Sequence, residues 1–351
     1  MKIKKVSFED RVFRFKHGEY LMSHVTQSQL NVRVLRLEAD DGSVGWGEII
    51  RRGIYDDEAP PREAAILDSL GEQAISTIPL AVQQLRQQGV VLRGMAFGLD
   101  TAYHDWVARK AGLPLYALLG GKSCESLPDY YSLSGGDPKD GAAALKAEAR
   151  GWAVVQIKLG IGNQDDDVAM VEAALDSLAE NQLILADFNG ALDVESALSV
   201  IAKFEDDRIV WEEPCRTLDD NSEVAARCGK PVMFDQCMSD LTAIIRVASE
   251  GLAHSVAIKP PFLGGLGIAR VARDICIEAG LPVRIDGPWC GHIATAANLH
   301  LACGAPADLL IAGCDLRQPL ILDEDWGGTR HLPGHRIAPL DEPGHGVNPV
   351  P

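Results

Sequence analysis

Five charged residues end successive apolar runs in the second half of the chain. They are Lys158 in AVVQIK, Asp187 in LILAD, Glu212 in IVWE, Asp235 in PVMFD and Lys259 in SVAIK. Three carboxylates brought together offer the oxygen ligands that Mg²⁺ prefers, and like charges that close need a cation between them. Two amines beside a bound molecule could remove a proton from it and return one. The order therefore predicts a metal site with a proton carrier on either side.

The spacing of these residues predicts how they are positioned. Successive members are 29, 25, 23 and 24 residues apart, about the length of a strand, a helix and two loops in a repeating β/α unit. Each run is short, apolar and rich in β-branched residues, as a strand buried on both faces should be. The rhythm continues to Asp286 and Asp315. Because β/α barrels place their chemistry at the carboxyl ends of the strands, we expect all five residues at one barrel mouth.

Simpler interpretations exist for each residue type. A single acid at a strand end is ordinarily solvated or caps the next helix, and a single lysine ordinarily extends to the solvent. Three acids in successive units favour the metal site. In the WEEP segment we expect Glu212 to be the ligand, with Glu213 on the other side of the strand.

Composition limits the class of protein. The 351 residues carry a net charge of -17, which argues against nucleic acid or an anionic membrane as partner. No run is long enough to span a membrane, and the N-terminus lacks the apolar core of a signal peptide. The eight cysteines form no CxxC pair, so we expect reduced thiols in a cytoplasmic protein.

The chain divides into two expected domains. Residues 1–125 read as an α+β domain: two long strands with a hairpin turn at DDG, then helices near 61–75, 79–88 and 97–112. Residues 126–317 hold the β/α repeats. We expect the tail, residues 318–351, to pack back on the first domain and complete it.

The motifs QIKLG, LADFNG, WEEP, FDQ and IKPPFLGGLGIAR together resemble the enolase superfamily, in the branch of mandelate racemase and muconate lactonizing enzyme. The resemblance implies a modified TIM barrel, (β/α)7β, with an N-terminal α+β capping domain. It implies Mg²⁺ held by Asp187, Glu212 and Asp235, with Lys158 and Lys259 as acid/base pair. The shared step is removal of the proton alpha to a carboxylate, the metal holding the enediolate.

The chain departs from the usual family pattern at several positions. Gln156 stands where the first lysine of a Lys-x-Lys motif is usual, and Gln236 where a glutamate commonly follows the third ligand. Lys259 replaces the His–Asp dyad of mandelate racemase, which disfavours mandelate as substrate. Asp315 lies in Cys-Asp-Leu rather than the Asp-x-Asp of dipeptide epimerases, which disfavours dipeptides.

Two subgroups resemble the chain further, one epimerising proline betaines and one dehydrating cis-3-hydroxy-L-proline. In this family two loops of the capping domain set specificity, here residues 18–26 and 49–59. Tyr55 and Trp289 would form an aromatic wall around a substrate nitrogen, with Asp286 as its ionic partner. The simpler interpretation is that Trp289 packs the barrel rim.

Three functions follow, in order of preference. The first is a racemase or epimerase of a small proline-like or N-methylated amino-acid derivative. The second is a dehydratase of a hydroxylated amino acid, and the third is a non-catalytic metal-binding barrel. The expected partner is a small carboxylate, and family members often form homo-oligomers. His292 is expected to begin a helix, and the GGLG stretch at 264–267 to be a tight turn before the next helix rather than a phosphate loop.

Overall fold

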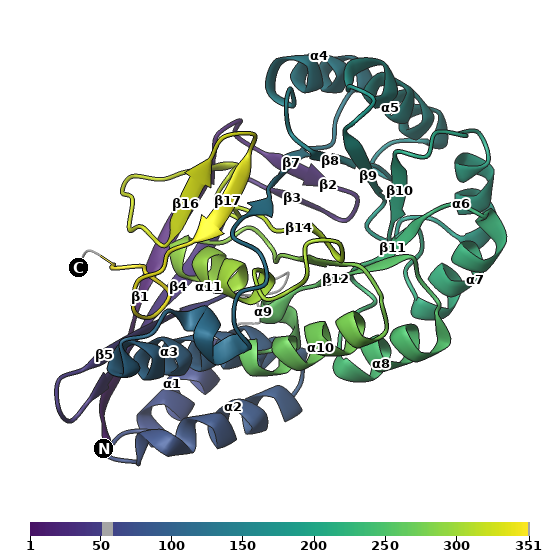
Figure 1. Ribbon diagram of the computed structural model, residues 1–351. Helices are drawn as coiled ribbons and strands as arrows, with labels where there is room; N and C mark the ends of the chain where they lie inside the picture. The colour runs from purple at the N-terminus through teal and green to yellow at the C-terminus, as the bar shows by residue number, and fades with distance from the viewer. Residues whose placement is uncertain (51–58, 350–351) are drawn as a thin grey trace.

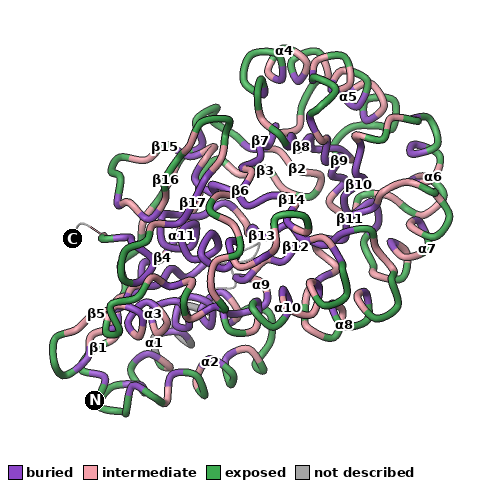
Figure 2. Tube along the Cα trace, in the orientation of Figure 1, coloured by how far each residue is buried: buried purple, intermediate pink, exposed green. Residues whose placement is uncertain are grey.

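The computed structural model describes residues 1–50 and 59–349. A barrel of parallel strands and a smaller part of antiparallel strands and helices lie side by side (Figure 1). The barrel strands are buried, and most of the helices around them have exposed residues on the outside, whereas the helix at residues 292–302 is buried along its whole length (Figure 2). None of the described helices is long and apolar enough to cross a membrane.

Eight parallel strands form the barrel in the order β14-β13-β12-β11-β10-β9-β8-β7. Their bounds are Tyr130–Leu133 (β7), Val154–Lys158 (β8), Leu183–Asp187 (β9), Ile209–Glu212 (β10), Val232–Phe234 (β11), Ser255–Ile258 (β12), Val283–Ile285 (β13) and Leu310–Ala312 (β14). The helices that follow the first seven strands are Pro138–Glu148 (α4), Gln164–Ser177 (α5), Val194–Ile201 (α6), Leu218–Cys228 (α7), Leu241–Glu250 (α8), Leu266–Glu278 (α10) and His292–Ala302 (α11). Seven β/α units and a final strand confirm the (β/α)7β barrel.

The sequence specifies where these helices begin. Side chains that accept a hydrogen bond from a backbone N–H of the first turn cap five of them, namely Asp137, Asn163, Asp193, Thr217 and Asp240. Helices α7 and α8 end at glycines in the left-handed region, which glycine adopts without steric cost. These signals give five helices a defined first residue and two of them a defined last residue, and because the strands are parallel, their carboxyl ends lie at the same face.

The first and last strands are joined through the segment before β7. Gly313 N–H donates to the carbonyl of Pro128 at 3.0 Å, in the short strand β6 (Leu127–Pro128). Asp315 N–H donates to the Asp129 carboxylate at 2.9 Å. These bonds link the end of β14 to the segment that leads into β7, so the barrel is nearly closed.

The capping sheet is antiparallel, in the order β15-β1-β4-β5. Its strands are Ile3–Phe15 (β1), Gln29–Ala39 (β4), Val44–Ile49 (β5) and Leu320–Ile321 (β15). The predicted DDG turn joins β4 to β5, with Gly42 at φ +82°. Helices of this part are Ala59–Ser69 (α1), Ile78–Gln87 (α2) and Arg93–Ala111 (α3), with short 3₁₀ turns at Ile75–Thr77, Val90–Leu92 and Leu115–Leu119. The antiparallel sheet and its helices confirm the capping domain of the predicted fold class.

Helix α3 packs directly on β5 because glycines leave room for the backbone. A Cβ atom on Gly47 would lie 1.9 Å from the carbonyl oxygen of Gly98, and one on Gly94 would lie 1.7 Å from that of Ile50. Any larger residue at these positions would push the helix off the strand. α3 is thus buried along most of its length, between the capping sheet and the short helix Pro260–Leu263 (α9) of the barrel.

A small hairpin connects the capping sheet with the barrel mouth. Strands Tyr20–Met22 (β2) and Val25–Gln27 (β3) pair with each other and lie beside β7 and β8 in Figure 1. Gly135 N–H donates to the Leu21 carbonyl at 3.1 Å, and Leu21 N–H donates to Ser134 Oγ at 2.9 Å. The hairpin is therefore fixed to the loop that follows β7.

The tail packs on both parts of the molecule. β15 pairs with the end of β1, while Thr329–Leu332 (β16) and Arg336–Pro339 (β17) form a sheet with β6. The domain limits at residues 125 and 317 stay a prediction.

Candidate active site

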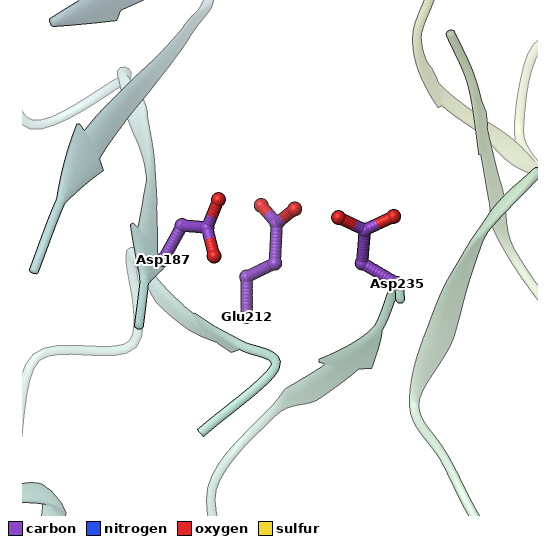
Figure 3. A group of neighbouring side chains, drawn as sticks. All are labelled: Asp187, Glu212 and Asp235. Carbon is purple, nitrogen blue, oxygen red and sulfur yellow. The ribbon is translucent and has the colours of Figure 1, made fainter. Parts of the chain in front are cut away.

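Three carboxylates lie side by side at the carboxyl ends of neighbouring barrel strands. Asp187 and Glu212 are the last residues of β9 and β10, and Asp235 directly follows β11. All three are buried, and one oxygen of each lies within 4.8 Å of the other two. Figure 3 shows the Glu212 carboxylate between those of Asp187 and Asp235. The structure thus brings together the three predicted metal ligands.

The donor set suits a hard divalent cation. Carboxylate oxygens from three strands are the ligands that such ions take. Asp235 Oδ1 is buried and has no hydrogen-bond partner within residues 1–50 and 59–349. A buried carboxylate oxygen is unfavourable unless a donor or a cation faces it. This oxygen, beside two further carboxylates, therefore fits a metal ion.

The two lysines lie at the outer members of the triad. Lys158 Nζ donates to Asp187 Oδ2 at 2.5 Å, and Lys259 Nζ donates to Asp235 Oδ2 at 2.6 Å. Burial would lower the pKa of both amines, but the adjacent carboxylates outweigh burial and raise it. One ammonium group thus stands on either side of the acidic triad.

Two residues just beyond the strand ends hold the ligand carboxylates in place. Asn189, at φ +48°, donates from its backbone to Asp187 Oδ1 at 2.8 Å and from its amide to Oδ2 at 2.9 Å. Glu213, at φ +41°, accepts from the backbone N–H of Asp235 at 2.6 Å and of Cys237 at 2.8 Å. Burial and the nearby Asp235 raise the pKa of Glu213 to about 8. Glu213 therefore shapes the segment that carries Asp235, and Glu212 alone of the two glutamates joins the triad.

An arginine of the barrel interior that belongs to none of the sequence motifs contacts the central carboxylate of the triad. Arg284 of β13 is fully buried and donates two hydrogen bonds to Glu212, from Nη1 to Oε2 at 2.6 Å and from Nη2 to Oε1 at 2.5 Å. Burial would raise the pKa of Glu212, but Arg284 outweighs it and the pKa falls to about 2. Such a two-pronged contact fixes both the charge and the plane of the carboxylate.

Asp286, predicted to pair with a substrate nitrogen, already has partners in the protein. Its Oδ2 forms an ion pair with Arg284 Nε at 2.9 Å and accepts from the Tyr130 hydroxyl at 2.9 Å. Its Oδ1 is buried and unpaired among the described residues. The carboxylate thus holds Arg284 toward Glu212, and one oxygen remains for another donor.

Trp289 of the predicted aromatic wall has an aromatic neighbour among the described residues. Trp289 meets the Tyr20 ring edge-on, with centroids 5.4 Å apart, and Tyr20 stacks on Phe15 at 5.6 Å. Tyr20 comes from β2, within the first predicted specificity loop. Tyr55 lies outside the described residues, as does most of the loop 49–59. Tyr20 is therefore the partner of Trp289 that the structure shows.

A period-2 signal could have found Arg284. Residues two apart on a strand face the same side, so Arg284 shares its side with Asp286. A charged residue inside an apolar strand is almost never buried unless it is paired, so Arg284 would be expected to have an acidic partner. Tyr20 gave no comparable signal, because the way a hairpin inserts between domains depends on the tertiary structure.

The comparisons with known proteins agree with this geometry. A family model described as "Enolase C-terminal domain-like" matches residues 140–351, and one for the "Mandelate racemase / muconate lactonizing enzyme, N-terminal domain" matches residues 10–120. The chain therefore belongs to the enolase superfamily. Within it, the chain is a member of the mandelate racemase and muconate lactonizing enzyme branch.

Individual relatives extend over the whole chain. The cis-3-hydroxy-L-proline dehydratase of Roseibium aggregatum is 27% identical over 100% of this chain and 97% of its own length. The N-succinyl-L-Arg/Lys racemase of Bacillus cereus is 23% identical over 93% of this chain and 90% of its own length. A crystal structure of an enolase-superfamily member from Roseovarius nubinhibens, complexed with magnesium, superposes with a TM-score of 0.88 at 27% identity, covering 100% and 96% of the two chains. The chain is thus an enzyme, an isomerase or a lyase of this superfamily, and the non-catalytic alternative is set aside.

Proposed function

We propose that the protein removes the proton alpha to the carboxylate of a small amino-acid derivative in a Mg²⁺-dependent reaction, and that it epimerises this carbon. The observation that carries the proposal is the pair of amines, Lys158 and Lys259, that contact the two outer carboxylates of the acidic triad. Asp187, Glu212 and Asp235 would hold the Mg²⁺ ion. Its positive charge would stabilise the negative charge that builds up on the substrate carboxylate when the proton is removed.

The chain's own residues account for the proton transfers. The carboxylates that raise the pKa of the two lysines would act on them less when they hold Mg²⁺, so one lysine can take its neutral form. That lysine removes the alpha proton from one face of the carbon, and the other, as an ammonium group, delivers a proton to the opposite face. Lys158 and Lys259 can exchange these roles for the two enantiomers. Glu212 stays oriented by Arg284 throughout, so the substrate carboxylate meets a fixed set of charges.

Two features support a proline-like substrate. Trp289 and Tyr20 form an edge-to-face aromatic pair, and Tyr20 lies near enough to Lys158 for the two to interact electrostatically. Aromatic faces attract a cationic nitrogen by about 0.5–2 kcal/mol. Asp286 lies within the same barrel and keeps one carboxylate oxygen unpaired within the described part of the chain. The full-length relative from Roseibium aggregatum is named for its action on cis-3-hydroxy-L-proline.

That relative also supports a second candidate, dehydration of a hydroxylated proline. The first proton removal would be the same. A lysine in its ammonium form would then protonate the departing β-hydroxyl instead of the alpha carbon. The likeness over the whole of both chains favours this outcome, whereas the two amines by themselves account for epimerisation.

Proton exchange in deuterated water tests the proposal. With Mg²⁺ present, each enantiomer of a proline betaine should lose its alpha-proton NMR signal and give its mirror form. cis-3-Hydroxy-L-proline should instead give an unsaturated product if the enzyme is a dehydratase. Absence of both with the folded, Mg²⁺-loaded protein over a panel of proline derivatives would contradict a proline-like substrate.

Substituting each lysine in turn tests which one acts on which face of the alpha carbon. Lys158→Ala and Lys259→Ala should each lower inversion by a factor of at least about 100, the size of a lost general acid or base. Each variant should retain alpha-proton exchange with only one enantiomer, because one amine remains. Lys203→Ala, at an exposed position, is the control. Substantial inversion by either active-site variant would refute the two-lysine scheme.

A further inference from the structure

A chain of hydrogen bonds runs from the capping hairpin to the predicted metal ligands. The Tyr20 hydroxyl of β2 lies 2.6 Å from Ser132 Oγ of β7. Ser132 Oγ donates to Gln156 Oε1 of β8 at 2.7 Å. Gln156 Nε2 donates to Glu212 Oε2 at 2.9 Å and to Asp187 Oδ2 at 3.3 Å. All five residues are buried, so these bonds are shielded from water.

Every hydrogen bond in this series is donated in the direction of the carboxylates. The carboxylates only accept, so the Gln156 amide must turn its NH₂ group toward them and its carbonyl toward Ser132. Ser132 has one hydroxyl proton and uses it on that carbonyl. The Tyr20 hydroxyl must therefore donate to Ser132. Because the carboxylates can only accept, they fix the orientation of the Gln156 amide, and through it the directions in which the Ser132 and Tyr20 hydroxyls donate.

Gln156 makes this series of hydrogen bonds possible, because its amide both donates and accepts. A lysine, usual at this place in the family, carries an ammonium group with three donors and no acceptor. It could bind the carboxylates but could accept nothing from Ser132. The replacement of lysine by Gln156 therefore removes a charge next to Lys158 and extends the hydrogen bonds to Tyr20.

We propose that Tyr20, Ser132 and Gln156 are positioning residues that couple docking of the β2–β3 hairpin to metal binding at Asp187 and Glu212. The inference rests on the proposed metal site. Metal binding and hairpin docking require the same orientation of Gln156, so each stabilises the other. Because coupling between two sites is reciprocal, it has two independent readouts, metal affinity and hairpin protection. Trp289, which packs on Tyr20, would be ordered together with the hairpin.

The test combines Mg²⁺ titration calorimetry with amide hydrogen exchange on the full chain. Tyr20→Phe should bind Mg²⁺ about fivefold more weakly, the value of one net hydrogen bond. Gln156→Met should bind it more weakly still. The double variant should match Gln156→Met alone, because Tyr20 acts through Gln156. In the native protein, Mg²⁺ should slow exchange in residues 20–27, and Tyr20→Phe should abolish this slowing.

Tyr131→Phe is the matched control. Tyr131 neighbours Ser132 on the same strand, but its hydroxyl donates to Glu148 at 3.1 Å, away from the chain. It should bind Mg²⁺ like the native protein. Additive effects of Tyr20→Phe and Gln156→Met, or an unchanged Mg²⁺ response of the hairpin in Tyr20→Phe, would overturn the proposal.

Failure of the coupling can be told apart from failure of the metal site. If the native protein binds no Mg²⁺, the proposed function and the coupling fail together. If it binds Mg²⁺, and Asp187→Asn abolishes that binding while Tyr20→Phe changes neither readout, the metal site stands and the coupling alone is refuted.

Discussion

The charges at the barrel mouth are compensated residue by residue. Two buried cations, Lys158 and Arg284, and the partly buried Lys259 face four buried carboxylates there, those of Asp187, Glu212, Asp235 and Asp286. Buried charges are tolerated only where such partners exist, and removing one partner is costly. Arg284 has the largest share, since it forms ion pairs with three of the acids, Glu212, Asp286 and, at 4.0 Å, Asp235. It therefore acts as an internal counter-ion of the ligand set.

Arg284→Met should expose this role. The variant removes the cation in direct contact with Glu212 and Asp286, which should lower the free energy of unfolding by about 3–5 kcal/mol. Mg²⁺ would restore part of the missing positive charge. The rise in Tm on adding Mg²⁺ should therefore be larger in the variant than in the native protein, as measured by thermal unfolding with and without EDTA.

Arg273→Met provides the comparison. Arg273 is also buried, but it donates to the carbonyls of Leu301 and Leu119, remote from the triad. It should lose stability without any gain in the Mg²⁺ response. An equal Mg²⁺ response in the native protein and in Arg284→Met would mean that Arg284 does not offset the ligand charge.

The sequence predicts those site residues whose place at the barrel mouth follows from their position along a single strand. Asp187, Glu212 and Asp235 each end an apolar run, so their place at the mouth follows from the barrel rule alone. Arg284 contacts Glu212 from a strand three places away, and that pairing depends on how the barrel closes. No pattern local to either strand contains this information.

Two elements of the barrel begin on carboxylates supplied by the capping domain. Glu48 of β5 is buried and accepts from the backbone N–H of Gly291 at 2.5 Å and of Ala294 at 3.1 Å, at the start of α11. Asp100 of α3 accepts from Gly267 N–H at 3.0 Å, at the start of α10. Helix N-termini attract negative charge, so both contacts fasten the capping domain to the barrel. Asp100 also takes the place that an anion would occupy, in line with a tight turn at 264–267.

Glu48→Gln tests whether this contact also positions the aromatic wall. An amide offers one acceptor where two N–H groups need partners, and it lacks the charge. We expect a loss of about 1–3 kcal/mol of stability. Because Glu48 holds the end of the loop that carries Trp289, KM should rise several-fold with a smaller change in kcat. Steady-state kinetics and thermal unfolding of the variant measure the two effects.

Glu9→Gln, at an exposed position of the same sheet, is the control for Glu48 and should change neither quantity. A lowered Tm with native KM would show that the helix cap supports the fold without positioning Trp289.

At the scale of the whole molecule, the sequence predicts the barrel and the capping domain, but it does not predict the contacts between them. Intervals of 23 to 29 residues between strand ends follow from the size of one β/α unit, so the barrel was accessible from spacing. The contacts between the parts were not. Asp100 ends no strand and caps no helix of its own, and only the packing of α3 against α10 gives it a role.

We expect the pair of Asp100 and His104 to make the stability of the contact between the two parts depend on pH. His104 Nδ1 lies 3.2 Å from the Asp100 carboxylate. Burial would lower the pKa of His104 and raise that of Asp100, but each partner outweighs burial, so the pKa of His104 is raised and that of Asp100 lowered. Arg270 on α10 and Arg86 on α2 also act on the pair and do not reverse these directions.

The signs define a pH window. The contribution of His104 is complete below its unfolded pKa of about 6.5 and is lost as the pH rises through its folded pKa. That of Asp100 is complete above about 3.9 and is lost as the pH falls through its folded pKa. The Tm difference between the native protein and His104→Gln should thus be largest near pH 5.5 and shrink toward pH 9, roughly. His17→Gln, at an exposed histidine, should show a small difference at every pH. A difference for His104→Gln that grows above pH 7, roughly, would show that the charged pair does not hold the two parts together.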